Sequence, residues 1–154
     1  MHDNFTALAV TAIAEPVPGA HEGWEHLLGA CLVDLALLGP EIAAGTVGAA
    51  VLADGPDGPF TADASGENAH TACEIEALTG IGPGSLALDR REVVWVPDVA
   101  GEHRWRPWRR AVKGIWASAL ALPVDVDGTP GAVILYASAG SGTAVLRSLV
   151  AAAQ

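Results

Sequence analysis

Aromatic and basic side chains gather in one stretch of the chain, between residues 95 and 116. Four of the five tryptophans lie there, and five of the eight basic residues fall within the ten positions 104–113. Indole rings can line a pocket for a planar ligand, and an arginine can hold a carboxylate or phosphate through two hydrogen bonds. These residue types predict a ligand pocket whose candidate residues are Trp95, Asp98, Arg104, Trp105, Trp108, Arg109, Trp116 and Ser118.

A structural interpretation of the same residues competes with the pocket. Trp105 and Trp108 are three positions apart on a predicted helix, so they can anchor that helix to a sheet while the arginines face water. Asp98 follows Pro97 at the end of a predicted strand, where an aspartate often caps a loop. Whether the tryptophans enclose a cavity or fill it stays open at this point.

The histidines and carboxylates suggest no catalytic or metal centre. His21 and His26 have a spacing of five, which does not put them on one helical face for zinc. Nothing around the remaining histidines singles out a haem ligand, so no cofactor is expected. Glu74 and Glu76 project to opposite sides of a predicted helix, and we expect both to be solvated.

The cysteines and glycines favour structural roles. Cys31 and Cys73 lie on predicted helices outside any metal-binding spacing, and we expect both to be inert core thiols. The glycines at 80, 82 and 84 lack the spacing of a phosphate-binding loop and follow a helix, so they predict a tight turn.

Apolar spacing and turn residues predict the elements that position these side chains. The first elements are a helix from Trp24 to Leu38 stopped by Gly39-Pro40, and strands over 46–53 and 60–64. A helix over 67–79 follows, capped by Ser65 and Gly80, with Ala69, Ala72, Ile75 and Leu78 on one face. The remaining elements are a helical turn to Asp89, a strand over 93–96, a helix over 105–112, strands over 115–126 and 132–137, and a C-terminal helix over 141–154. Tight turns between strand pairs favour an antiparallel sheet covered by helices, an α+β fold.

Composition indicates one globular domain over residues 1–154, with residues 1–20 as a lead-in segment. Apolar residues make up 51 % of the 154 and charged residues 17 %. The net charge of −10 argues against direct binding of nucleic acid. No apolar run reaches the ~18 residues of a membrane span. Two cysteines and a start without Lys or Arg favour the cytoplasm.

Several short motifs together resemble the GAF domains of bacterial regulators, especially those that precede ANTAR RNA-binding domains. They are the run from Glu76 to Gly84, Val96-Pro97-Asp98, Arg104-Trp105-Arg106-Pro107-Trp108, Leu122-Pro123-Val124 and Gly131-Ala132. Each motif alone is mostly turn and core chemistry, but their order and spacing match the family from about Phe5 to Ala139.

The resemblance implies a five- or six-stranded antiparallel sheet, with the terminal helices on one face and a ligand pocket under loops and short helices on the other. It implies a non-enzymatic sensor that binds a small molecule and signals through its terminal helices or a downstream regulatory protein. Apolar stripes on both end helices predict a homodimer. The candidate interface residues are Trp24, Leu28, Cys31, Leu35, Leu146, Leu149 and Val150.

Three departures from the family bear on function. Many relatives have a cysteine where this chain has Gly84, and the ANTAR domain is missing, so any output is expected to pass through a partner. The strand before Pro123 is one residue longer than usual, which predicts a β-bulge and leaves open which face residues 115–118 occupy. Two alternatives remain: an enzyme of the free-methionine-sulfoxide reductase type, which uses a pocket thiolate, and a degenerate GAF scaffold for protein interaction only.

Overall fold

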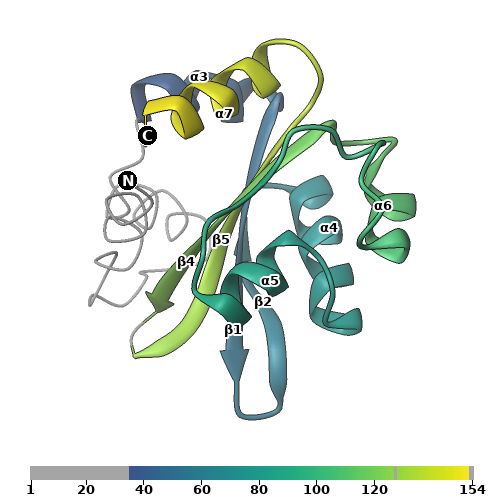
Figure 1. Ribbon diagram of the computed structural model, residues 1–154. Helices are drawn as coiled ribbons and strands as arrows, with labels where there is room; N and C mark the ends of the chain where they lie inside the picture. The colour runs from purple at the N-terminus through teal and green to yellow at the C-terminus, as the bar shows by residue number, and fades with distance from the viewer. Residues whose placement is uncertain (1–34, 127, 153–154) are drawn as a thin grey trace.

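A five-stranded antiparallel sheet forms the centre of the protein, in the strand order β2-β1-β5-β4-β3 (Figure 1). The computed structural model describes residues 35–126 and 128–152. The strands are β1 (Val47–Gly55), β2 (Gly58–Ala64), β3 (Val94–Val96), β4 (Ser118–Val126) and β5 (Thr129–Ala137). The helices are α3 (Leu35–Ala44), α4 (Glu67–Thr79), α5 (Pro83–Arg90), α6 (Arg106–Val112) and α7 (Ser141–Ala152). The predicted α+β class with an antiparallel sheet is confirmed.

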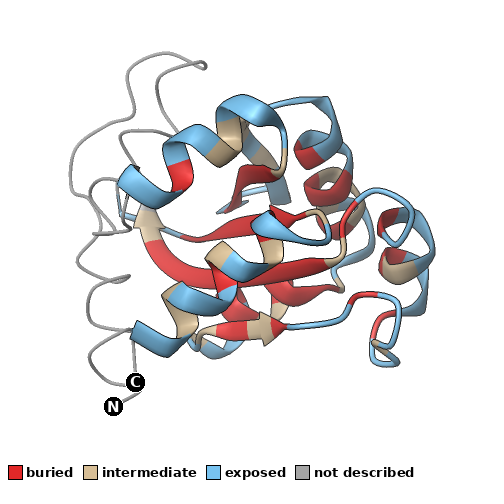
Figure 2. Ribbon diagram, turned by 90° about the horizontal axis from the view of Figure 1, so that it is seen from above, coloured by how far each residue is buried: buried red, intermediate tan, exposed pale blue. Residues whose placement is uncertain are grey.

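Helices cover both faces of the sheet. On the central strand β5, alternate side chains point to opposite faces, as the two-residue period of a strand requires. Ile134 and Tyr136 face α4, α5 and α6, and we call the core between these helices and the sheet the α4–α6 layer. Val133 and Leu135 face α3 and α7. Figure 2 shows the strands as the most buried part of the molecule, enclosed by helices whose outer sides are exposed.

The predicted helix 67–79 has the same bounds in α4, but it begins differently. Gly80 ends it in the left-handed conformation (φ 73°), and its N–H donates to the Glu76 carbonyl, as predicted. At the start, Gly66 is the N-cap and makes no side-chain bond. The hydroxyl of Ser65 instead accepts a hydrogen bond from the N–H of Ala49 at 2.8 Å, so this side chain secures β1 rather than capping the helix.

Three predicted boundaries are wrong by three residues or more, among them the start of β5, which is Thr129 rather than Ala132. Helix α3 runs through Gly39-Pro40 to Ala44, because Leu38 and Ile42 on either side of the proline pack on the sheet and hold the helix together despite its missing donor. Residues before 35, which include most of the predicted first helix, lie outside the described part.

The third error concerns residues 115–117, which precede β4 instead of belonging to it. The N–H groups of Ile115 and Trp116 both donate to the carbonyl of Val112 at 2.9 Å, so they prolong the end of α6 as a turn. From Ser118 onward, β4 pairs with β5 in continuous register, without the predicted bulge. A register shift between described strands instead lies in β1, between Val51 and Leu52, where β1 pairs with β2.

Candidate functional site

The predicted tryptophan wall is divided between the two faces of the sheet. Trp105, Trp108 and Trp116 lie in the α4–α6 layer. Trp95, at the centre of β3, points the other way and packs with the core under α3 and α7. Ser118 also faces that side, where its hydroxyl lies 2.9 Å from the hydroxyl of Thr143 on α7. The prediction that these residues line one pocket is therefore wrong for Trp95 and Ser118.

The three tryptophans that share the α4–α6 layer are buried and packed against aromatic neighbours. Trp108 is fully buried and meets Trp105 edge to face, with ring centroids 5.9 Å apart. Trp116 stacks on Tyr136 at 5.8 Å, and its indole N–H donates to the Asn68 carbonyl at 3.3 Å. Aromatic pairs of this geometry add to the stability gained from burial.

The predicted arginines lie at the rim of this layer. Arg104 is exposed, pairs with Glu102 through Nε at 2.6 Å, and stacks over the Trp105 ring at 4.2 Å. The hydrogen bond from Arg104 lowers the pKa of the Glu102 carboxyl. Arg109 donates from Nη1 to the Glu102 carbonyl at 3.3 Å. Both guanidinium groups therefore hold the segment that leads into α6.

A group of buried polar side chains lies in the same layer and was missed by the sequence analysis. Glu76 of α4 is 0 % exposed, so the prediction that it is solvated is wrong. Ser85 of α5, Trp108 of α6 and Tyr136 of β5 are buried as well. Each has one polar atom without a hydrogen-bond partner among the described residues. We call these four residues the buried polar cluster; the atoms are Glu76 Oε2, Ser85 Oγ, Trp108 Nε1 and Tyr136 OH.

The carboxyl of Glu76 sits in the turn that joins α4 to α5. Its Oε1 accepts a hydrogen bond from the N–H of Ser85 at 2.8 Å, at the start of α5. Burial raises the pKa of Glu76 to about 8, although the donor groups of Ser85 and Gly84 that face the carboxyl act in the opposite direction. The carboxyl is therefore mostly protonated at neutral pH.

The glycines of this turn leave room for the carboxyl. A Cβ at Gly82 would overlap Glu76 Oε1, and φ at Gly82 is 140°, which side chains rarely adopt. A Cβ at Gly84 would lie 2.7 Å from both Cδ1 and Cγ1 of Ile134. The packing between the turn, Glu76 and β5 therefore requires glycine at both positions.

Gly84→Ala is expected to lower the free energy of unfolding by about 1–3 kcal/mol, because the new methyl group overpacks against Ile134. Ile134→Ala removes both Cδ1 and Cγ1, the two atoms that a Cβ at position 84 would meet, and should restore part of the loss in the double variant. Urea unfolding of the four proteins measures the coupling. Equal losses for Gly84→Ala in the wild-type and Ile134→Ala backgrounds would show that this contact does not require the glycine.

Cys73 and the cluster member Tyr136 are both uncharged at neutral pH. Burial raises the pKa of the Cys73 thiol to about 12, and burial raises the pKa of Tyr136 well above its ordinary value. The prediction of an inert core thiol at Cys73 agrees with its burial, whereas Cys31 lies outside the described residues. Among the described residues, no three His, Cys, Asp or Glu side chains are grouped to hold a metal ion.

The buried face of α4 carried a signal that would have identified Glu76. Residues 69, 72, 73 and 76 follow the three-four spacing of one helical face, and all four are buried. The predicted face instead combined Ala69 and Ala72 with Ile75 and Leu78, which are more apolar than Cys73 and Glu76. Leu78 is in fact 78 % exposed. A glutamate on an otherwise small apolar stripe, followed by a glycine-rich turn, is the pattern that predicts a buried carboxyl here.

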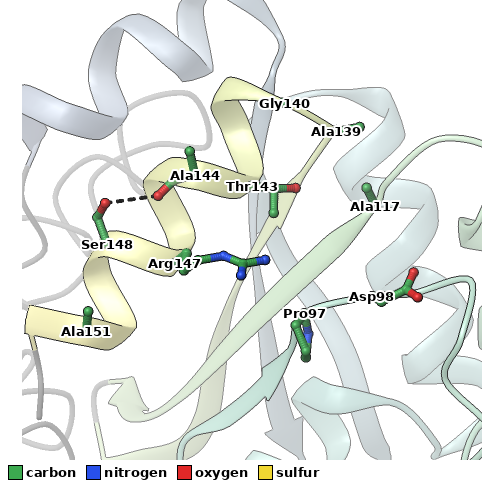
Figure 3. Close-up of a pocket in the computed structure, with 10 residues that line it drawn as sticks. All are labelled: Pro97, Asp98, Ala117, Ala139, Gly140, Thr143, Ala144, Arg147, Ser148 and Ala151. Carbon is green, nitrogen blue, oxygen red and sulfur yellow. Dashed lines mark hydrogen bonds between the residues drawn. The ribbon is translucent and has the colours of Figure 1, made fainter.

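A groove of about 620 Å³ lies on the opposite side of the sheet, beside α7 (Figure 3). Arg147 extends from α7 toward the groove, and Asp98 lies at its far end on the loop after β3. The other lining residues are small or short: Pro97, Ala117, Ala139, Gly140, Thr143, Ala144, Ser148 and Ala151. Asp98 is thus separated from the tryptophan layer. Arg147 is not among the predicted site residues.

The predicted dimer interface is only partly described. Trp24, Leu28 and Cys31 lie outside the described residues, and Leu35 is the first residue of α3. Leu146 is fully buried against the sheet of its own chain, so it does not reach an interface and that assignment is wrong. The last two candidates, Leu149 and Val150, are half-buried against the same core.

Comparisons with known proteins give no assignment. No family model matches the sequence, and neither the curated proteins nor the solved structures contain a significant match. In the described part of the chain, none of the helices has the length and apolar character needed to cross a membrane.

Proposed function

We propose that this protein is a GAF-type regulatory domain that binds a small polar molecule in the α4–α6 layer and does not catalyse a reaction. The observation that carries the proposal is the buried polar cluster, in which four polar atoms from four different elements lack partners within the described chain. Buried polar groups are nearly always hydrogen-bonded in folded proteins. A polar ligand in this layer would supply the missing bonds.

The energy of such binding is substantial. A buried polar group without a partner costs about 1–3 kcal/mol, so a ligand that satisfies several of them recovers that cost on binding. The groups come from α4, α5, α6 and β5, so a bound molecule would tie the helices to the sheet. A ligand would therefore order the layer as well as occupy it.

The same chemistry disfavours the reductase alternative. A thiolate nucleophile needs a lowered pKa, whereas burial raises that of Cys73 to about 12. Position 84, where many GAF relatives carry a cysteine, is a glycine with no space for a side chain. We therefore propose a binding domain of cytoplasmic regulators, and treat the pure interaction scaffold as the outcome if no ligand binds.

Signalling through α7 is part of the proposal. Tyr136 faces the ligand site, and the next residue, Ala137, faces α7 at the other side of the sheet. Gly142 in the first turn of α7 sits so tightly there that a Cβ would overlap the Thr46 carbonyl oxygen. A ligand that shifts the end of β5 would therefore move α7, and with it a partner protein or a second subunit.

Thermal unfolding followed by tryptophan fluorescence tests the proposal, with a library of nucleotides, amino acids, amines and aromatic acids. A ligand is expected to raise Tm by several degrees because it binds the folded state only. Tyr136→Phe should weaken the response, whereas Ser148→Ala, which removes an exposed hydroxyl bonded within α7, should leave it unchanged. A library without any stabilising compound would favour the scaffold instead.

A further inference from the structure

We infer that the ligand of the proposed site carries a protonated amine, which the Glu76 carboxylate binds as its counter-ion. The inference rests on the proposed function and names the chemical class of ligand for that site. The grounds are the charged and hydrogen-bonding groups that the α4–α6 layer contains.

Among the described residues, Glu76 is the only acidic side chain buried in the layer. Its Oε1 is bonded to the turn, but Oε2 has no partner in the same part of the chain. Arg109 of α6 donates from Nη1 to the Glu102 carbonyl at the rim, and its buried Nε has no partner among the described residues. Once ionised, the Glu76 carboxylate is the buried group in this layer that can pair with an ammonium ion through Oε2.

The other members of the cluster suit an amine as well. The hydroxyl oxygens of Ser85 and Tyr136 can accept hydrogen bonds from an ammonium group, which has three donors. Trp116 stacks on Tyr136, and Trp108 lies in the same core, so the layer contains aromatic rings. Aromatic faces attract cations, and the attraction grows when water is excluded.

Binding must be accompanied by the loss of a proton. Before binding, the Glu76 carboxyl is mostly protonated at neutral pH, because burial raises its pKa to about 8. The ligand brings one positive charge as an ammonium ion, and the carboxyl releases one proton to solvent. The net charge of the site therefore stays the same. The amine's affinity should therefore rise about tenfold per pH unit up to the pKa of Glu76.

The neighbouring titratable groups do not change this prediction. Cys73 on α4 and Tyr136 on β5 both interact with Glu76, and burial raises the pKa of each above the range of interest. Glu74 lies on the same helix but is half-exposed and accepts a hydrogen bond from Thr61 on β2. From α5, the groups that face the carboxyl are the N–H groups of Gly84 and Ser85 and the Ser85 hydroxyl, none of which titrates here. From α6, Trp108 is not titratable.

Three probes of equal length test the inference: n-butylammonium, n-butanol and n-butyrate. Calorimetry at pH 7 in phosphate and in MOPS buffer, neither of which is a primary amine, gives the number of protons released, since the two buffers differ in ionisation enthalpy. We expect n-butylammonium to bind with release of nearly one proton and with higher affinity at pH 8 than at pH 6. The indole N–H signals of Trp108 and Trp116 in NMR spectra should report the same titration.

Two matched variants separate a counter-ion from a structural role. Glu76→Gln keeps an oxygen that can accept the Ser85 hydrogen bond but cannot ionise, and it should weaken amine binding at least tenfold and abolish proton release. Glu74→Gln removes an acid two residues away and should change neither. Circular dichroism of both variants establishes that they are folded.

The inference and the proposed function can fail separately. Stronger binding of n-butanol or n-butyrate than of n-butylammonium at the Trp108 and Trp116 signals would overturn the ligand class and leave the site in place. Amine binding without proton release, or with equal affinity in Glu76→Gln, would overturn the role of Glu76. Absence of amine binding would overturn the inference, while the library screen on Tyr136→Phe decides the site independently.

Discussion

As the pH rises from 4.5 to 8, the titration of Glu76 is expected to lower the free energy of unfolding of the wild-type domain by up to about 5 kcal/mol. Glu76→Gln should remove this pH dependence. The side chain is fully buried, and its pKa is raised from 4.5 to about 8 because burial disfavours the charged form. Each pKa unit corresponds to about 1.4 kcal/mol, which sets the size of the effect.

The direction of the effect follows from proton binding in the two states. Between pH 4.5 and pH 8 the folded protein keeps the Glu76 proton, whereas the unfolded chain has released it. The folded state then binds more protons, so its stability falls as pH rises. The stabilisation due to the raised pKa is complete below pH 4.5 and is lost once the pH passes about 8.

Urea unfolding at closely spaced pH values measures the effect as a difference between proteins. Other carboxylates and histidines also titrate in this range, so the wild-type curve alone does not isolate Glu76. The difference between wild type and Glu76→Gln does, and Glu74→Gln is the control because its hydrogen bond with Thr61 lies at a half-exposed position. A wild-type curve parallel to that of Glu76→Gln would show that the carboxyl is ionised in the folded state.

Local chemistry explains why most of the element order was predictable. Gly80 ends α4 in the left-handed conformation, and Pro107 lies in the first turn of α6, because these residues constrain the backbone wherever they occur. The turn between β4 and β5 is marked in the same way by Gly128, with φ at 81°. Such signals act over a few residues, so a single sequence contains them.

The parts that were missed depend on contacts between distant segments. Trp95 lies on a strand of only three residues, and its orientation is fixed by its pairing with Leu120 on β4. The burial of Glu76 depends on the turn at residues 80–84 folding back over its carboxyl. Pro40 stays inside a helix because the sheet holds the residues on both sides of it. None of these contacts follows from local spacing.

Gly82→Ala is expected to be the most destabilising of the small substitutions, with a loss of about 3–5 kcal/mol in the free energy of unfolding. At Gly82 the backbone has φ 140° and ψ 178°, a region that is essentially restricted to glycine. The added methyl group would also overlap Glu76 Oε1, so the carboxyl would have to leave the N–H of Ser85. Backbone strain and the loss of a buried hydrogen bond then act together.

Gly80→Ala separates the two causes. Gly80 has φ 73° in the left-handed region, but a Cβ there meets no atom within 4 Å, so the expected loss is about 1 kcal/mol. If the clash with the carboxyl matters, Gly82→Ala should lower the free energy of unfolding less in a Glu76→Ala background than in the wild type. Urea unfolding measures both losses. Where Gly82→Ala alone does not fold, a folded double variant is the evidence for the clash. Equal losses for Gly80→Ala and Gly82→Ala would contradict the assignment, because the turn would then tolerate a side chain where the Glu76 carboxyl is placed. The proposed amine site depends on the same contact, since a carboxyl displaced by the methyl group of Gly82→Ala could not present Oε2 to an amine.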